Sequence, residues 1–137
     1  MIGILIICHG DLGNSLVRCA NHVMGVKAPY LVDLSITIQD DPDAATARAR
    51  ALINHLDRGE GVLILCDICG ATPCNIATRL ISPGRVECLA GVNLPMLVRA
   101  LTYRDESLPA VAEKALIGAR DGALRLSCEA AECSIKR

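Results

Sequence analysis

Two apolar runs rich in β-branched residues constrain the fold of this chain more than any other feature. They occupy residues 2–8 (IGILIIC) and 61–66 (GVLILC). Strands without a polar face are typical of a parallel sheet that is covered on both sides. The two runs therefore predict central strands of an α/β domain.

The rest of the chain alternates between strand and helix patterns. Shorter strands are predicted at 30–34 and 86–90, and helices are predicted to begin near Asp11 or Asn14, Asp41, Thr72, Asn93 and Ser107. Strands and helices that alternate across short loops predict a single doubly wound α/β domain, with a mainly parallel sheet of four strands and helices on both faces. Residues 123–128 (ALRLSC) predict a fifth, antiparallel strand at the C-terminal end.

Composition limits the functions that are compatible with this fold. The chain has 137 residues, no Phe or Trp, and a formal charge of −1 from scattered charged residues. Neither a basic patch nor aromatic platforms are available, so no nucleic-acid partner is expected. The first apolar run is too short to span a bilayer and has no basic flank, which predicts a cytoplasmic protein.

The eight cysteines do not suggest a disulfide scaffold, because several of them lie inside apolar segments. We expect reduced thiols that pack as small apolar groups, with no metal and no cofactor. The spacing of Cys66 and Cys69 also fits a redox dithiol or half of a zinc site. A redox dithiol normally opens a helix, whereas Cys66 ends an apolar run.

Polar residues follow the first and third predicted strands, where ligands collect in doubly wound sheets. His9 comes directly after the first strand and Asp67 after the third. A lone histidine at a strand end is usually a solvated side chain, and Asp67 read alone is a turn or helix cap. Together they suggest a nucleophilic ring whose tautomer a carboxylate fixes. His22 and His55 lie inside predicted helices, where solvation or the helix dipole accounts for each.

The loop after Asp67 has the composition of an anion site. It reads DICGATPCN over residues 67–75 and leads into a helix whose first amides point toward the strand ends. Gly70, Ala71 and Thr72 are the candidate phosphoryl-binding residues. The loop lacks the Gly-Lys-Ser/Thr ending of a nucleotide triphosphate site.

Three sequence blocks in this order carry a resemblance to a known family: CHG at residues 8–10, DICGATPCN at 67–75, and AGVNLPML at 90–97. They resemble the IIA component of the mannose family of the bacterial phosphoenolpyruvate:sugar phosphotransferase system. The resemblance implies a IIA domain over residues 1–122, with 123–137 as a C-terminal strand and tail of the same domain. It also implies a homodimer, because relatives exchange such a strand between subunits.

The resemblance implies a phosphotransferase with a phosphohistidine intermediate. His9 accepts phosphate from the phosphocarrier protein HPr and passes it to a IIB component for sugar uptake, so that membrane contact occurs only through the transporter complex. Asp67 orients the ring, and Thr72 helps to hold the phosphoryl group although the family more often has Ser there. Two alternatives stay open: a regulatory sensor of phosphorylation state, and the phosphocarrier subunit of a dihydroxyacetone kinase.

Overall fold

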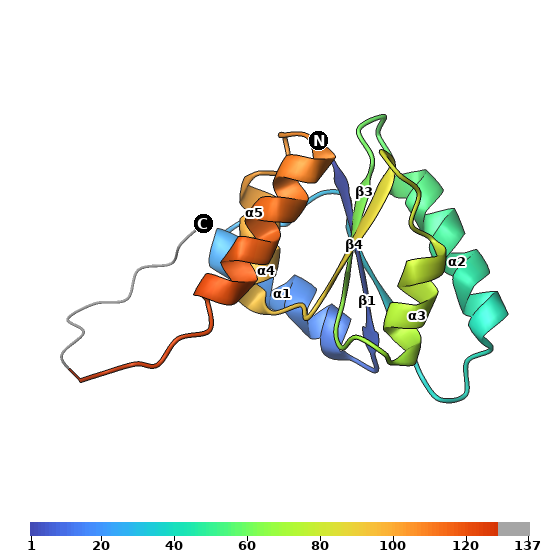
Figure 1. Cartoon of the computed structure of the whole chain (residues 1–137), viewed down its shortest axis with the longest axis horizontal. Coiled ribbons are helices and arrows are strands. Elements are labelled where there is room, and N and C mark those ends of the chain that lie inside the picture. Colours follow the sequence, from blue (N-terminus) through green and yellow to red (C-terminus); the bar gives the residue numbers. More distant parts are fainter. Residues whose placement is uncertain (129–137) are drawn as a thin grey trace.

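A computed structural model describes residues 1–128 of the chain, and four strands and five helices alternate along this part (Figure 1). The strands are β1 (Gly3–His9), β2 (Leu31–Ile36), β3 (Val62–Cys66) and β4 (Val86–Ala90). The helices are α1 (Leu12–Met24), α2 (Pro42–Leu56), α3 (Thr72–Arg79), α4 (Leu94–Thr102) and α5 (Leu108–Asp121). The predicted elements up to residue 121 are therefore present, with small shifts at their ends.

The four strands form one sheet in the order β2-β1-β3-β4, and every neighbouring pair is parallel. β1 lies between β2 and β3, so that the chain passes from one side of β1 to the other between β2 and β3. That position is the topological switch point. The connections that leave the carboxyl ends of β1 and β3 run in opposite directions there, which leaves room for a site between them.

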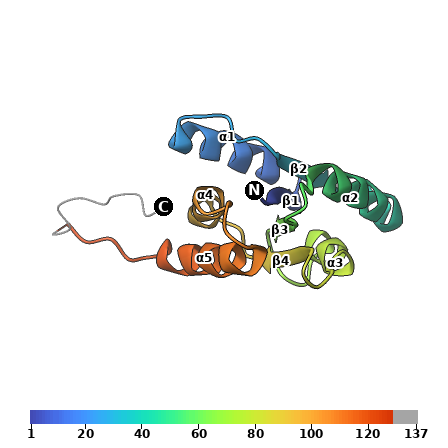
Figure 2. The same ribbon diagram turned by 90° about the horizontal axis from the view of Figure 1, so that it is seen from above.

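Helices cover both faces of the sheet, as Figure 2 shows when the sheet is seen nearly end-on. One face packs against α2 and α3, and the opposite face packs against α1, α4 and α5. The strand residues of β1 alternate between these two cores, with Leu5 and Ile7 in one and Ile4 and Ile6 in the other. The apolar runs of the sequence are thus explained, because β1 and β3 have no solvent-facing side.

Three helices begin with the signals that the sequence contains. Asp41, Asn93 and Ser107 each accept a hydrogen bond from the backbone amide three residues on, at 3.3, 2.9 and 3.4 Å, and each is followed by a proline in the first turn. Capping of this kind satisfies amides that have no partner inside the helix. Asp11 differs, since its side chain makes no capping hydrogen bond to α1.

The predicted fifth strand is not formed in the single chain. Residues 123–128 have no regular secondary structure, are exposed, and run away from the sheet after α5 (Figure 1). A strand needs a neighbouring edge to supply its hydrogen bonds, and this segment meets none in residues 1–128. The rest of the predicted tail, 129–137, lies outside the described residues.

Candidate functional site

The carboxyl ends of β1 and β3 bring His9 and Asp67 into contact. The two strands are neighbours in register, with Ile7 opposite Cys66. Asp67 Oδ2 accepts a hydrogen bond from the backbone N–H of His9 at 2.9 Å and lies 2.6 Å from Nδ1 of the His9 ring. Residues 58 positions apart in the sequence therefore form one polar pair.

The hydrogen bonds of Asp67 determine which ring nitrogen of His9 carries the proton. Burial tends to raise the pKa of this carboxyl, but the hydrogen bonds from the His9 amide, the His9 ring and the Ile68 amide outweigh burial and lower the pKa below its usual value. The carboxylate is then ionised at neutral pH and can only accept hydrogen bonds. Nδ1 must donate, so a neutral His9 ring has its lone pair on Nε2.

The His9 side chain is more exposed than that of Asp67, as expected for a nucleophile and the carboxylate that orients it. The His9 side chain is 52% exposed, whereas that of Asp67 is 11% exposed. Within residues 1–128, Nε2 has no hydrogen-bond partner. The carboxylate is thus enclosed behind the ring, and Nε2 is accessible to another molecule.

Backbone contacts fix the turn that follows His9. Gly10 has a φ of +52°, and its N–H donates to the carbonyl oxygen of Ile36 at 3.0 Å. The Ser35 hydroxyl donates to the carbonyl oxygen of Gly10 at 2.7 Å. Ser35 was not predicted to be part of the site, although it is a hydroxyl residue directly after the predicted strand 30–34.

The loop from Asp67 to Ala71 leads into α3 at the same edge of the sheet. Gly70 has a φ of +89°, a conformation that favours glycine. Ala71 precedes α3 and offers no side chain to cap it, and Pro73 in the first turn has no N–H. The amides of Thr72 and Cys74 at the start of α3 therefore have no side-chain cap, which leaves them available to an anion.

The third sequence block supports the end of β3. The N–H of Gly91 donates to the carbonyl oxygen of Asp67 at 2.8 Å, and the N–H of Val92 donates to that of Cys66 at 3.0 Å. Asn93 caps α4 through its side chain. This block thus fixes the backbone position of Asp67 through hydrogen bonds.

His22 and His55 lie away from this site. Each is in the last turn of its helix, α1 or α2, and these helix ends lead into β2 and β3 at the opposite edge of the sheet. The His55 ring lies 6.4 Å from the ring of Tyr30, measured between centroids.

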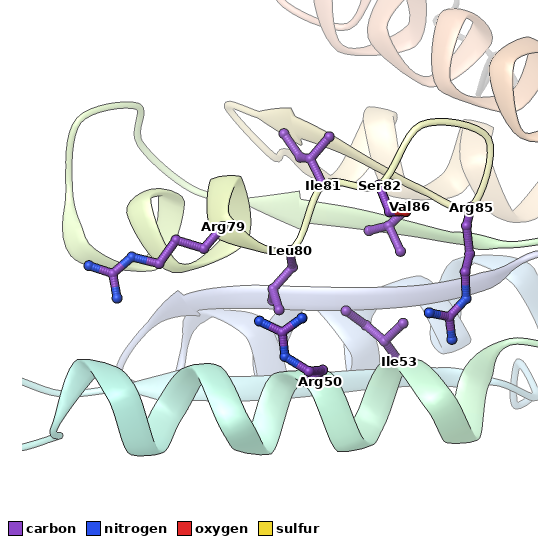
Figure 3. A pocket seen from close by; sticks show the side chains of 8 residues that line it. All are labelled: Arg50, Ile53, Arg79, Leu80, Ile81, Ser82, Arg85 and Val86. Carbon is purple, nitrogen blue, oxygen red and sulfur yellow. The ribbon is translucent and has the colours of Figure 1, made fainter.

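A separate pocket of about 290 Å³ lies between α2, α3 and the start of β4 (Figure 3). Arg50, Arg79 and Arg85 line it together with apolar side chains. Arg85 is paired with Asp57 at 2.9 Å, and Arg79 lies 3.5 Å from Asp43. Neither His9 nor Asp67 borders this pocket, so its cations take no part in the polar pair.

The part of the chain that the structure describes lacks two further features. Residues 1–128 contain no cluster of His, Cys, Asp and Glu side chains suited to a metal ion. No helix in the same part of the chain is long and apolar enough to cross a membrane.

Comparisons with known proteins confirm the family that the three sequence blocks resemble. A family model described as the PTS system fructose IIA component matches residues 3–116, where PTS stands for the phosphotransferase system. The PTS system mannose-specific EIIAB component of Escherichia coli strain K12 is 31% identical over 106 residues, which are 77% of this chain and 32% of that protein. The PTS system fructose-specific EIIA component of Bacillus subtilis strain 168 is 30% identical over 112 residues, covering 77% of this chain and 72% of that protein.

Solved structures show the same fold. The mannose/sorbose specific IIA subunit from Enterococcus faecalis superimposes with a TM-score of 0.83 at 19% identity, covering 97% of this chain and 98% of that chain. The phosphotransferase system component EIIA from Streptococcus agalactiae gives a TM-score of 0.81 at 22% identity, covering 91% of this chain and 97% of that chain. The chain spans about a third of the length of the Escherichia coli relative. With most of its residues matched by the family model, the chain belongs to the family of PTS IIA components.

Proposed function

We propose that this protein is a phosphoryl carrier of the sugar phosphotransferase system and that Nε2 of His9 is the atom that carries the phosphoryl group. Membership of the IIA family supports the phosphotransfer role. The observation that carries the assignment to His9 is the 2.6 Å contact between Nδ1 and Asp67, which leaves Nε2 as the exposed nucleophile.

The first step of the proposed reaction is attack on phospho-HPr. The Nε2 lone pair forms a bond to phosphorus while the bond from phosphorus to its donor atom on HPr breaks, and the electron pair of that bond returns to the donor atom. The His9 ring gains positive charge as the new bond forms, and the Asp67 carboxylate stabilises this charge through the Nδ1 proton. Nδ1 keeps its proton throughout, as does a histidine held by a carboxylate in other nucleophilic sites.

The phosphoryl oxygens need donors that are already in place. The uncapped amides at the start of α3 and the positive φ of Gly70, which turns the backbone there, suit this role, and Gly70, Ala71 and Thr72 are the residues we propose for it. In the second step a nucleophile of a IIB component attacks phosphorus, and the electron pair of the N–P bond returns to Nε2. The second step returns His9 to its starting form, so the carrier can accept phosphate again.

The proposed carrier acts in the cytoplasm and handles phosphate rather than sugar. Its relatives are named for mannose, fructose and mannose/sorbose, so the family leaves the sugar of this system undetermined. We propose HPr as the donor and a IIB component as the acceptor. We also propose a homodimer, in which residues 123–128 find in a second copy the strand partner that they lack in one chain.

The test is incubation of the purified protein with phosphoenolpyruvate, enzyme I and HPr, followed by intact-mass measurement. One added phosphoryl group is expected, lost in acid and retained in base as for a phosphoramidate. His9→Ala should abolish the gain, whereas His22→Ala, which changes a histidine at the opposite edge of the sheet, should leave it intact. Phosphate on the His9→Ala variant contradicts the assignment, and a phosphorylated protein that no IIB component can dephosphorylate favours a regulatory role.

A further inference from the structure

Four cysteines lie in or beneath the loop that carries Asp67, and the function described above uses none of their thiols. Cys66 is the last residue of β3, Cys74 is in the first turn of α3, Cys88 is in β4, and Cys69 is in the loop itself. We call these four residues the thiol cluster. They come from four different elements, so that only the folded chain brings them together.

Distances within the thiol cluster are short. Cys66 Sγ lies 2.8 Å from Cys74 Sγ and 3.9 Å from Cys88 Sγ. Cys69 is near enough to Cys74 to contribute to the raised pKa of the Cys74 thiol. A disulfide has an S–S length of about 2.0 Å, so Cys66 and Cys74 need to approach by less than about 1 Å to be joined.

The thiols of the cluster differ in their access to solvent. Cys66 is fully buried and Cys74 is 6% exposed, whereas Cys69 is exposed on the loop. The cluster therefore runs from Cys69 at the surface to Cys74 and Cys66 inside, and the sulfur atoms of the inner two are 2.8 Å apart. A small oxidant reaches the sulfur of Cys69 directly and that of Cys66 only through its neighbours.

The protonation of the inner thiols decides the order in which the cluster reacts. Burial, followed by hydrogen bonding to Cys66, raises the pKa of Cys74 to about 12. The hydrogen bond with Cys88 and burial also raise the pKa of Cys66. Thiolates rather than thiols attack peroxides, so the two inner cysteines do not begin an oxidation at neutral pH.

We propose that Cys66 and Cys74 are a modification site at which a peroxide produces a reversible intramolecular disulfide, with Cys69 as the thiol that reacts first. The Cys69 thiolate attacks the O–O bond, which breaks to give a sulfenic acid and an alcohol, or water from hydrogen peroxide. The Cys74 sulfur then attacks the Cys69 sulfur, and hydroxide leaves with the Cys74 proton as water. Finally Cys66 attacks Cys74, and Cys69 leaves as a thiolate that takes up the Cys66 proton.

The atoms and electrons of this sequence balance. Two thiols lose two protons and two electrons, and the peroxide accepts both as its O–O bond breaks and its two oxygen atoms leave as water or alcohol. The product closes residues 67–73, the segment that contains Asp67 and the start of α3, into a covalent ring. The proposal concerns the thiols alone and does not depend on whether His9 carries phosphate.

The experiment treats the reduced full-length protein with hydrogen peroxide at neutral pH, alkylates the free thiols after unfolding, and maps all eight cysteines by peptide mass. We expect a Cys66–Cys74 linked peptide, a monomeric mass lower by two hydrogen atoms, and recovery of both thiols with dithiothreitol. Alkylated Cys66 and Cys74 in protein whose Cys69 has been oxidised overturn the proposal. A cross-link that maps to any other pair does so as well.

Variants distinguish the thiol that reacts first, Cys69, from the two that form the disulfide, Cys66 and Cys74. Cys69→Ser should slow disulfide formation about tenfold or more, because the exposed thiol is removed while the 2.8 Å pair is kept. Cys74→Ser should leave Cys69 as a sulfenic acid that dimedone traps. Cys19→Ser is the matched control, since Cys19 is an exposed cysteine of α1 outside the cluster, and it should change neither the rate nor the product. A wild-type rate in Cys69→Ser contradicts the order of reaction.

Discussion

Replacing Asp67 by Asn tests how much the His9–Asp67 contact contributes to phosphoryl transfer. The Oδ2 atom of Asp67 accepts bonds from the amide and the ring of His9, and Oδ1 accepts a bond from the Ile68 amide at 2.8 Å. Asn has the same shape but only one acceptor oxygen. In either orientation of the amide, its NH2 group faces at least one N–H donor, and the negative charge beside the ring is lost.

The magnitude follows from the strength of the lost interaction. A hydrogen bond to a charged group contributes about 1.5–3 kcal/mol. Since each ~1.4 kcal/mol of barrier is a factor of ten in rate, the loss corresponds to an acceptance rate about 10- to 150-fold lower. The contact already exists before phosphorylation and strengthens as positive charge grows on the ring, so only this increase acts on the barrier and about 150-fold is the upper limit.

The assay is the initial rate of phosphorylation by phospho-HPr, measured by quenched-flow intact mass at saturating donor. Asp57→Asn is the matched control, because Asp57 also accepts two backbone amides, those of Gly59 and Gly61, and pairs with a cation, Arg85, at the far edge of the sheet. It should change stability without changing the acceptance rate of the folded protein. A rate within about twofold of wild type for Asp67→Asn would contradict this prediction, because the charged contact would then contribute almost nothing to the barrier.

Three further predictions concern stability and assembly. Gly3→Ala should lower the free energy of unfolding in urea by about 1–3 kcal/mol or more, because the added Cβ would lie 2.5 Å from the backbone oxygen of Leu56; an unchanged midpoint contradicts this packing. The lowered pKa of Asp67 stabilises the fold above the ordinary aspartate pKa of about 3.9, and this stability is lost as the pH falls through the lowered pKa. In urea unfolding between pH 5 and pH 2, Asp67→Asn should therefore lose less free energy of unfolding than wild type does. Equal losses count against an ionised Asp67. Removal of residues 123–137 should raise the monomer fraction in sedimentation equilibrium, and a full-length protein that is monomeric at micromolar concentration argues against the dimer.

Much of the fold was predictable because its determinants are local. Residues 2–8 and 61–66 are apolar on both faces, and only a strand between two helical layers buries both faces of such a run. Asp41, Asn93 and Ser107 cap helices through their own side chains, which is a contact across three residues. The sequence also predicted that His9 and Asp67 lie at one edge of the sheet, because both follow strands of a parallel sheet.

Local reasoning was wrong at Asp11, for a reason that the backbone shows. A capping residue normally has an extended backbone that directs its side chain toward the first free amides. Asp11 has φ −89° and ψ 1° instead, because the turn through Gly10 sets its direction, and its carboxylate makes no capping hydrogen bond. The turn is held by Ser35 and Ile36 of β2, which are distant in sequence.

Tertiary structure alone decided the contacts between distant segments. Arg104, a charged residue between two helices, is only 7% exposed, because its guanidinium donates to the carbonyl oxygens of Ile2, Pro29 and Tyr30 at 2.6–3.2 Å. The 2.6 Å distance from Asp67 to His9 and the 2.8 Å distance between Cys66 and Cys74 depend likewise on strand order and register. Residues 123–128 have the pattern of a strand but no neighbouring edge, and they stay irregular in the single chain. A sequence pattern determines which face of a segment is apolar, whereas hydrogen bonds between segments form only where the whole fold places a partner.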